Sequence, residues 1–150
     1  MNWQKLYNPI VIVLLRSPLH SLMDKSTILI TFTGRKSGKK YTVPVSYVRD
    51  GDTLMMISQR EHSWWKNLRG GAQVALYLQG HTLRARGDVF TDAETVANKL
   101  LLFLGQFPGY QRLMHMKLAA NGQPENPEAF QRFAQEMVIV QMKELEEVAA

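Results

Sequence analysis

The order of apolar and polar positions divides the chain into a strand-rich first part and a more helical second part. Short runs of β-branched and aromatic residues, bounded by glycine and polar residues, are typical of β-strands. Such runs occur at residues 27–33, 41–48, 53–58, 73–79 and 82–90. Most of the turns between them are short, which favours antiparallel pairing of neighbouring strands.

Helical spacing dominates the second part of the chain. Thr91 and Asp92 resemble a helix start with acid in the first turn, and they predict a helix that runs to about residue 104. Further helices are predicted at residues 110–120 and 127–135, a helical turn at 64–68 and a last strand at 137–143. The acidic tail, residues 143–150, is expected to be helical or frayed.

These elements predict an α+β domain, mainly antiparallel β, built as a closed or half-closed barrel of five or six strands with helices at its ends. The length of 150 residues fits a single domain, residues 1–150. Its expected parts are an N-terminal helical segment, a five-strand barrel core, a helical region and the last strand, at residues 1–25, 27–90, 92–136 and 137–143. Pro44 lies inside the second strand and predicts an edge, a bulge or an unpaired stretch beside a ligand.

The composition removes several classes of site. The chain has no cysteine, which excludes disulfides and thiolate chemistry and fits a cytoplasmic protein. Its four histidines are not at metal-ligand spacing, so no metal site is predicted, and no serine stands in a G-x-S-x-G elbow. The apolar run at residues 10–15 is too short to cross a bilayer, although the N-terminal segment could still lie on a membrane surface.

Positive charge is concentrated in the first 70 residues. They carry 11 Lys and Arg against 4 Asp and Glu, whereas the remainder carries 7 against 9. This asymmetry indicates an anionic partner of the first part, for which small-molecule phosphates, nucleic acid and an acidic membrane surface all qualify. A merely basic, soluble surface is the alternative.

The sharpest motif is the basic turn, residues 34–40, with the sequence Gly-Arg-Lys-Ser-Gly-Lys-Lys. Glycines let backbone N–H groups approach a ligand, and successive N–H groups in a turn form an anion-binding concavity. Arg35 offers a two-pronged donor, Lys36 and Lys39 offer point charges, and Ser37 adds a hydroxyl. The turn leads into a strand and so is not a Walker A loop. The alternative is a solvated hairpin tip.

A second motif, Trp64-Trp65-Lys66-Asn67-Leu68, places two tryptophans on different sides of a short helix. One of them can close the core while the other covers a planar ligand. Asn67 and Arg69 could donate to a phosphate or a carbonyl, and core packing with a helix cap is the alternative. Tyr110 is one of three tyrosines that could donate a proton or stack on a ring.

Residues 29–45, together with Asp50-Gly-Asp52 and residues 64–68, resemble the signature of the deazaflavin-dependent nitroreductase family. The similarity covers residues 28–90, with a weaker match at 107–110 and in the last strand. This resemblance implies a six-stranded split β-barrel related to flavin-binding, pyridoxamine oxidase-like proteins. It also implies cofactor F420, a deazaflavin with a phosphate and a polyglutamate tail, and hydride transfer to quinones, nitro compounds or similar electrophiles.

The resemblance further assigns roles to individual residues. The phosphate or tail falls to Arg35, Lys36, Ser37 and Lys39, the deazaflavin to the backbone near Val43 and Pro44, and its cover to Trp64 and Asn67. Ser58 and Arg60 stand in the loop after the third strand, and Tyr110 faces the substrate. The alternatives are FMN on the same fold and a non-catalytic module for anionic ligands or a membrane surface. Nucleic acid is not expected as a partner, and a homodimer is an open expectation.

Overall fold

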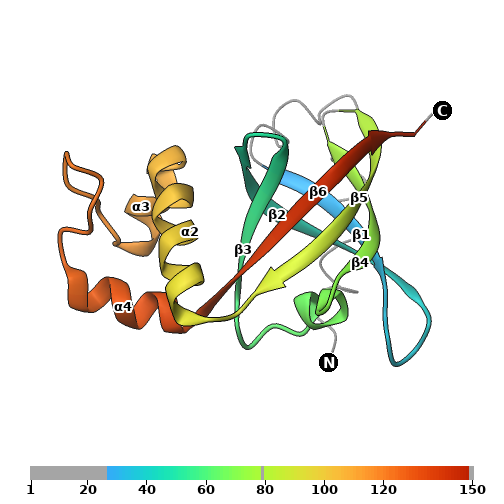
Figure 1. The fold of residues 1–150 in the computed structure, drawn as a ribbon, viewed down its shortest axis with the longest axis horizontal. Helices are drawn as coiled ribbons and strands as arrows, with labels where there is room; N and C mark the ends of the chain where they lie inside the picture. Colours follow the sequence, from blue (N-terminus) through green and yellow to red (C-terminus); the bar gives the residue numbers. More distant parts are fainter. Residues whose placement is uncertain (1–26, 79, 149–150) are drawn as a thin grey trace.

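A closed antiparallel barrel forms the centre of the molecule (Figure 1). The computed structural model describes residues 27–78 and 80–148. The six strands are β1 (Thr27–Thr33), β2 (Lys40–Asp50), β3 (Thr53–Gln59), β4 (Ala72–Leu78), β5 (His81–Phe90) and β6 (Met137–Glu147). They pair in the order β1-β2-β3-β6-β5-β4, and β4 pairs with β1 to close the barrel. The predicted fold class is confirmed.

Three α-helices of the described residues lie together on one side of the barrel (Figure 1). They are α2 (Ala93–Gln106), α3 (Pro108–Met114) and α4 (Pro127–Gln135). The Asp92 side chain caps α2 by accepting a hydrogen bond from the Thr95 amide at 3.0 Å. Asn126 caps α4 in the same way, through the Ala129 amide at 3.1 Å, and Pro127 follows at the first helical position. None of the helices in the described part of the chain is long and apolar enough to cross a membrane.

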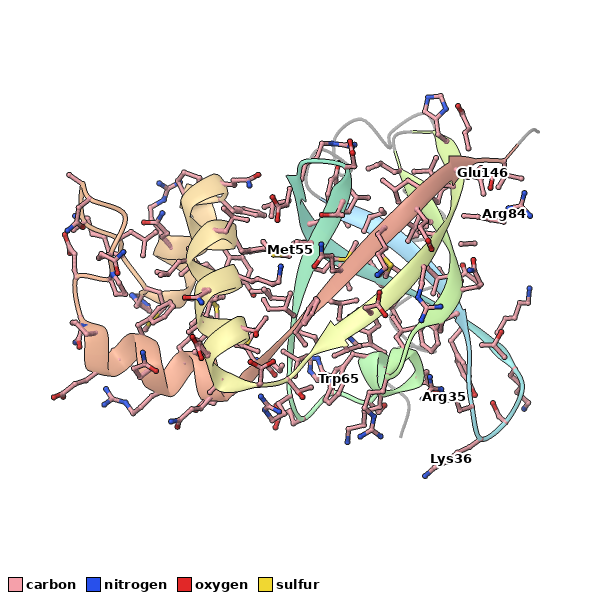
Figure 2. All side chains as sticks on the ribbon, viewed as in Figure 1. Arg35, Lys36, Met55, Trp65, Arg84 and Glu146 are labelled. Carbon is pink, nitrogen blue, oxygen red and sulfur yellow. The ribbon has the colours of Figure 1, made fainter. Side chains whose placement is uncertain are left out.

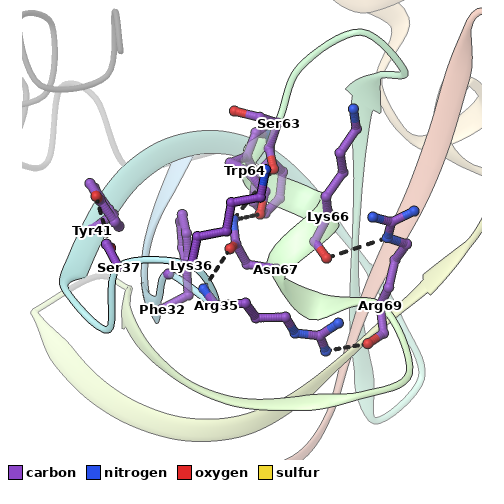
Figure 3. A pocket seen from close by; sticks show the side chains of 11 residues that line it. Phe32, Arg35, Lys36, Ser37, Tyr41, Ser63, Trp64, Lys66, Asn67 and Arg69 are labelled. Carbon is purple, nitrogen blue, oxygen red and sulfur yellow. Dashed lines mark hydrogen bonds between the residues drawn. The ribbon is translucent and has the colours of Figure 1, made fainter. Parts of the chain in front are cut away.

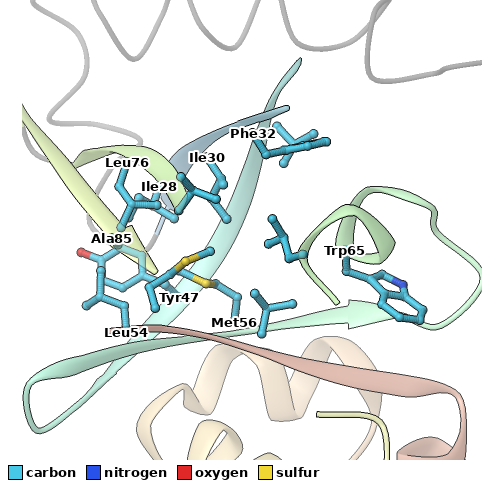
Figure 4. Packing of buried hydrophobic residues seen from close by; sticks show 14 of the residues in the cluster. Ile28, Ile30, Phe32, Tyr47, Leu54, Met56, Trp65, Leu76 and Ala85 are labelled. Atoms are coloured by element: carbon cyan, nitrogen blue, oxygen red, sulfur yellow. The ribbon is translucent and has the colours of Figure 1, made fainter. Parts of the chain in front are cut away.

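Strands β3 and β6 separate two apolar cores. In β3, Leu54 and Met56 point into the barrel, whereas Met55 and Ile57 point toward the helices. Strand β6 alternates in the same way along residues 137–142. Because side chains alternate along a strand, two buried faces require the nearly continuous apolar runs that these strands have. Figure 4 shows the barrel core, where residues from several strands meet.

The chain after β5 departs from the prediction at the second helix. A helix was predicted at residues 110–120, but α3 begins at Pro108 and ends at Met114. His115 adopts a left-handed conformation with φ of +56°, which stops the helix. The Gln111 side chain then accepts a hydrogen bond from the Leu118 amide, and Leu118 bridges to Pro124.

The prediction of a helical or frayed tail is wrong over residues 143–147, because β6 continues to Glu147. There the strand pairs with β5, with Glu146 opposite Arg84 and Glu147 opposite Leu83. An extra residue is accommodated near Glu144, whose φ is +56°, as a β-bulge. The acidic tail thus faces cations on β5, and Arg84 lies 3.7 Å from Glu146 (Figure 2). The predicted helical segment at residues 1–25 lies outside the described residues.

The barrel wall is split between β2 and β3. Their ladder covers only residues 47–50 of β2 and 53–56 of β3. Residues 40–46 of β2 pair with β1 instead, and residues 57–59 of β3 pair with β6. Pro44 therefore lies where β2 is paired on its β1 side only, which is the kind of position that its missing N–H predicted.

The packing of α2 gives a stability prediction. Phe103 has no exposed surface and contacts the rings of Phe107 and Tyr110, with centroids 5.8 and 5.3 Å away. Phe103→Ala should lower the free energy of unfolding by about 3–5 kcal/mol, because it leaves a cavity in the core beside the helices. Leu102→Ala, its neighbour with 41% exposure, should cost less than about 1 kcal/mol. Urea unfolding measures both, and equal losses would contradict this packing.

Candidate functional site

The basic turn between β1 and β2 is held closed by its own backbone. The Gly34 amide donates to Lys39 O and the Gly38 amide to Gly34 O, both at 2.8 Å. Gly38 has a φ of +71°, a conformation that favours glycine. A Cβ on Gly34 would lie 2.7 Å from the Tyr41 ring, so this glycine allows the turn to fold onto β2. The cationic side chains are exposed around this fixed backbone.

A short 3-10 helix, η2 (Trp64–Leu68), binds the basic turn on its other side. The Arg35 amide donates to Asn67 Oδ1 at 3.0 Å, and Asn67 Nδ2 in turn donates to Trp64 O at 3.1 Å. The Arg35 guanidinium donates to Arg69 O, just beyond η2. Two segments 32 residues apart in sequence are therefore locked together, as Figure 3 shows.

Between the turn and η2 lies a groove of about 610 Å³, here called the basic groove. Its lining residues include four cations and several neutral donors, and none is acidic. The cations are Arg35, Lys36, Lys66 and Arg69. Such a set of donors favours a ligand that carries more than one negative charge.

A second hollow of about 210 Å³ lies in the split between β2 and β3, and it is called the split hollow. Residues 43–46 of β2 form one wall, and residues 57–59 of β3 form another. Tyr110, His62 and Met137 complete the lining. Most of these walls are apolar, which suits a planar ring rather than a charged group.

Trp64 is the wall that the basic groove and the split hollow share. Its indole N–H donates to Ser58 Oγ at 3.0 Å, and only 3% of the residue is exposed. Ser58 is itself buried, and its hydroxyl donates to Gln59 O. Because this second hydrogen bond holds the hydroxyl, it also fixes the orientation of the Trp64 indole. Trp64 therefore stands between the basic groove and the split hollow, and its indole is held in place by the hydrogen bond to Ser58.

Trp65 contributes to the core and to the position of nearby cations. Its indole N–H donates to Gln59 O at 3.2 Å, and the ring belongs to the barrel core. Lys66 and Arg69 lie over this ring at 5.8 and 5.7 Å from its centroid. Both tryptophans belong to the barrel core, and the predicted cover of a planar ligand by one of them stays a prediction.

Tyr110 projects from α3 into the split hollow. Its ring stands edge-on to Phe103, with the centroids 5.3 Å apart, and to Phe107 at 5.6 Å. Burial raises the pKa of the Tyr110 hydroxyl above its ordinary value of 10.0. The hydroxyl therefore keeps its proton at neutral pH and is a hydrogen-bond donor.

The structure brings together most of the residues that the sequence singled out. The basic groove gathers Arg35, Lys36, Ser37, Trp64 and Asn67. The split hollow gathers Val43, Pro44, Ser58, Trp64 and Tyr110. Lys39 is exposed and lies outside the lining of both.

Arg60 is not brought to either hollow. Its guanidinium donates to Gln135 O, Thr91 O and Met137 O at 3.1, 2.9 and 3.2 Å. These carbonyls lie at the end of α4, after β5 and at the start of β6. Arg60 therefore joins the helical layer to the barrel.

Sequence reasoning missed four residues of the basic groove: Phe32, Tyr41, Ser63 and Lys66. Lys66 had a detectable signal, because it stands three residues before Arg69 on a helical turn, where side chains share a face. Tyr41 forms a hydrogen bond with Ser37 Oγ at 3.2 Å, a contact that depends on the tight turn between them.

The barrel has the split-barrel fold, which solved structures of other proteins share. An F420-H2 dependent reductase is 19% identical, with a TM-score of 0.54 over 81% of this chain and 96% of that one. An FAD and heme binding protein from Mycobacterium smegmatis is 12% identical, with a TM-score of 0.53 over 90% and 75%. At these identities the likeness shows the fold.

The sequence identifies the family to which the chain belongs. The sequence model of the F420H(2)-dependent quinone reductase family matches residues 17–113, and the chain belongs to this family. It is thus an oxidoreductase that uses cofactor F420 to reduce quinone-type acceptors. The search of curated proteins returned no match.

The contacts of Arg60 predict that it contributes to stability, whereas a cation that lines the basic groove, such as Lys66, contributes to ligand binding. Arg60→Gln should lower the free energy of unfolding by about 2 kcal/mol, because three carbonyls lose a charged donor. It should leave the dissociation constant of F420 within about twofold of the wild-type value. Lys66→Gln, the matched control, should weaken F420 binding and leave the free energy of unfolding nearly unchanged. Urea unfolding and fluorescence titration measure these effects, and an Arg60→Gln variant that is stable but binds F420 weakly would contradict this assignment.

Proposed function

We propose that reduced F420 binds across both hollows and that the quinone is reduced in the split hollow. In this arrangement the phosphate and glutamate end of the cofactor lies in the basic groove. Its ring system lies along Val43 and Pro44, under Trp64. The observation that carries the proposal is that Trp64 is the common wall of a cationic groove and an apolar hollow.

The chemistry of the basic groove fits the cofactor. Arg35 and Arg69 offer planar donor forks, and Lys36 and Lys66 offer point charges without a neighbouring acid in the groove lining. One phosphate needs fewer cations than this groove provides. A cofactor with a phosphate and additional carboxylates uses the whole set, which favours F420 over FMN.

The split hollow fits the reacting end. Reduced F420, when bound, supplies a hydride, which is two electrons and one proton. Val43, Ile57 and Met137 provide apolar contact for a ring and exclude water from its face. The backbone of β2 at residues 43–46 has no β3 ladder partner among the described residues, so its polar groups on that side can meet the edge of a ring.

Tyr110 is proposed as the residue that orients the acceptor. A quinone that receives a hydride needs one further proton to become a hydroquinone, and solvent supplies it. The Tyr110 hydroxyl donates a hydrogen bond to the quinone oxygen on which negative charge develops. Because burial raises its pKa above the ordinary value for tyrosine, this donor stays protonated at neutral pH. A nitro oxygen would be held by the same donor.

Charge reversal in the basic turn tests the cofactor end. Lys36→Glu should weaken F420 binding about tenfold or more, because reversing a charge about 5 Å from an anion costs on the order of 1.6 kcal/mol even in water. Lys40→Glu, the matched control, lies outside the groove lining and should change the affinity less than about threefold. Fluorescence titration at low and high salt measures both, and unchanged binding in Lys36→Glu would remove the turn from the site.

Tyr110→Phe tests the acceptor end. It should lower kcat/KM for a quinone by about tenfold through loss of one hydrogen bond to a developing charge, with F420 affinity unchanged. The wild-type rate should show no loss assignable to ionisation of Tyr110 between pH 6 and 9, because burial raises the pKa of this hydroxyl. Steady-state rates between pH 6 and 9 check this. A variant as active as wild type would refute the assignment.

A further inference from the structure

The chain between η2 and β4 consists of Arg69, Gly70 and Gly71, which are called the glycine loop below. Gly70 and Gly71 have φ of +79° and +94°, a backbone conformation that favours glycine. Arg69 is one of the cations that line the basic groove. Its carbonyl also accepts a hydrogen bond from the Arg35 guanidinium, as Figure 3 shows. The conformation of the glycine loop therefore determines where two cations of the groove lie.

Arg86 of β5 contacts the glycine loop from the barrel. Its guanidinium donates to Gly70 O at 3.4 Å. It also lies against Gly71, because a Cβ built on that glycine would collide with Nη2 and Cζ of Arg86. Two adjacent carbonyls of the loop are thus bonded by different arginines, Arg69 O by Arg35 and Gly70 O by Arg86. These bonds join the loop to the basic turn on one side and to the barrel on the other.

Charges on the barrel wall orient Arg86, which does not itself line the basic groove. Asp88 stands two residues further along β5, on the same side of the strand, and its Oδ1 lies 3.7 Å from Arg86 Nε. Lys143 of β6 lies 3.1 Å from the other carboxylate oxygen of Asp88. The Asp88 side chain is only 25% exposed, so solvent and salt screen it less than a surface carboxylate. This row of charges holds the Arg86 guanidinium beside the glycine loop.

The contacts of Arg86 have a larger effect on the order of the loop than on the stability of the fold. The Arg86 side chain is 39% exposed, and partly exposed ion pairs contribute little to the free energy of unfolding. The hydrogen bond to Gly70 O, in contrast, restrains two consecutive glycines, the residue type with the greatest backbone freedom. Loss of Arg86 is therefore expected to loosen the glycine loop while the barrel stays folded.

We propose that Arg86 is a positioning residue, which fixes the glycine loop and thereby holds Arg69 and Arg35 in place for the anionic end of F420. This inference rests on the proposed function, because it takes the basic groove as the place where that end binds. Cations that are ordered before the cofactor arrives lose less conformational entropy when it binds. Arg86 therefore increases the affinity for F420 through the loop, without touching the cofactor.

Two arginines of β5 provide a matched test on the full-length protein. Arg86→Gln should raise the dissociation constant of F420 about fivefold and leave kcat at saturating F420 and quinone within about twofold of wild type. Arg84→Gln, the control, removes an equal charge from a side chain that pairs with Glu146 of β6 at 3.7 Å. It should leave the dissociation constant within about twofold of wild type. Fluorescence titration measures both, and equal losses of affinity would show a long-range charge effect and overturn the role of Arg86.

The two glycines of the loop provide a second matched pair of variants. The Cβ of Gly71→Ala would collide with the Arg86 guanidinium, whereas the Cβ of Gly70→Ala would meet nothing within 4 Å beyond its chain neighbours. Both alanines carry the strain of a positive φ, so the difference between them reports the contact with Arg86. Gly71→Ala should therefore bind F420 about fivefold more weakly than Gly70→Ala. Arg86→Gln should have little further effect in Gly71→Ala, because the contact is already lost.

Hydrogen exchange of the Gly71 amide reports on the loop without the cofactor. This amide donates to Leu68 O at 2.9 Å, and its exchange rate should rise about threefold or more in Arg86→Gln and stay unchanged in Arg84→Gln. An exchange rate in Arg86→Gln equal to that of wild type would overturn the inference. If wild type does not bind F420, the proposed function fails, and the exchange rates still decide whether Arg86 orders the loop.

Discussion

The docking of the basic turn on η2 is the contact on which the site depends. The Arg35 amide and guanidinium both bind η2 and its following residue, through Asn67 Oδ1 and Arg69 O. Without these bonds the cations at residues 35 and 36 would be a mobile hairpin tip, and the groove beside Trp64 would have one wall. Lysine and arginine side chains are long and flexible, so it is the fixed backbone beneath them that gathers a local excess of charge around one groove.

The second constraint is the interruption of pairing between β2 and β3. A barrel with a complete β2–β3 ladder would leave no space for a ring beside residues 43–46. Pro44 is compatible with the interruption because it lacks the N–H that a ladder on both sides of β2 would require. The wall is then rebuilt from η2 and α3, through Trp64 and Tyr110. Much of the lining of both hollows therefore comes from turns and short helices held by the barrel, as is common for functional sites.

Much of this arrangement could be predicted from local patterns in the sequence. Runs of β-branched and aromatic residues indicated the strands, and the glycines and cations of residues 34–40 indicated the turn, because these signals lie within a few residues of one another. The predictions that were wrong concern residues whose interaction partners lie far away in the sequence. The acidic tail is a strand because its backbone pairs with β5, where Glu146 lies opposite Arg84. Arg60 is held by carbonyls about 30 and 75 residues away. Neither partner is visible in a local window. Lys66 was missed because its role needs the turn folded against η2.

The shared wall of β3 and β6 has a consequence for how the molecule unfolds. One face of each strand belongs to the barrel core and the other to the core beneath the helices. Loss of the helical layer would expose Met55 and Ile139 to water, and loss of the barrel would expose Leu54 and Val140. If one core unfolded while the other stayed folded, one face of both shared strands would expose a large apolar area to water, which is unfavourable. The two layers are thereby coupled into one cooperative unit, so a destabilising change in α2 or α4 also lowers the fraction of molecules in which the hollows are folded.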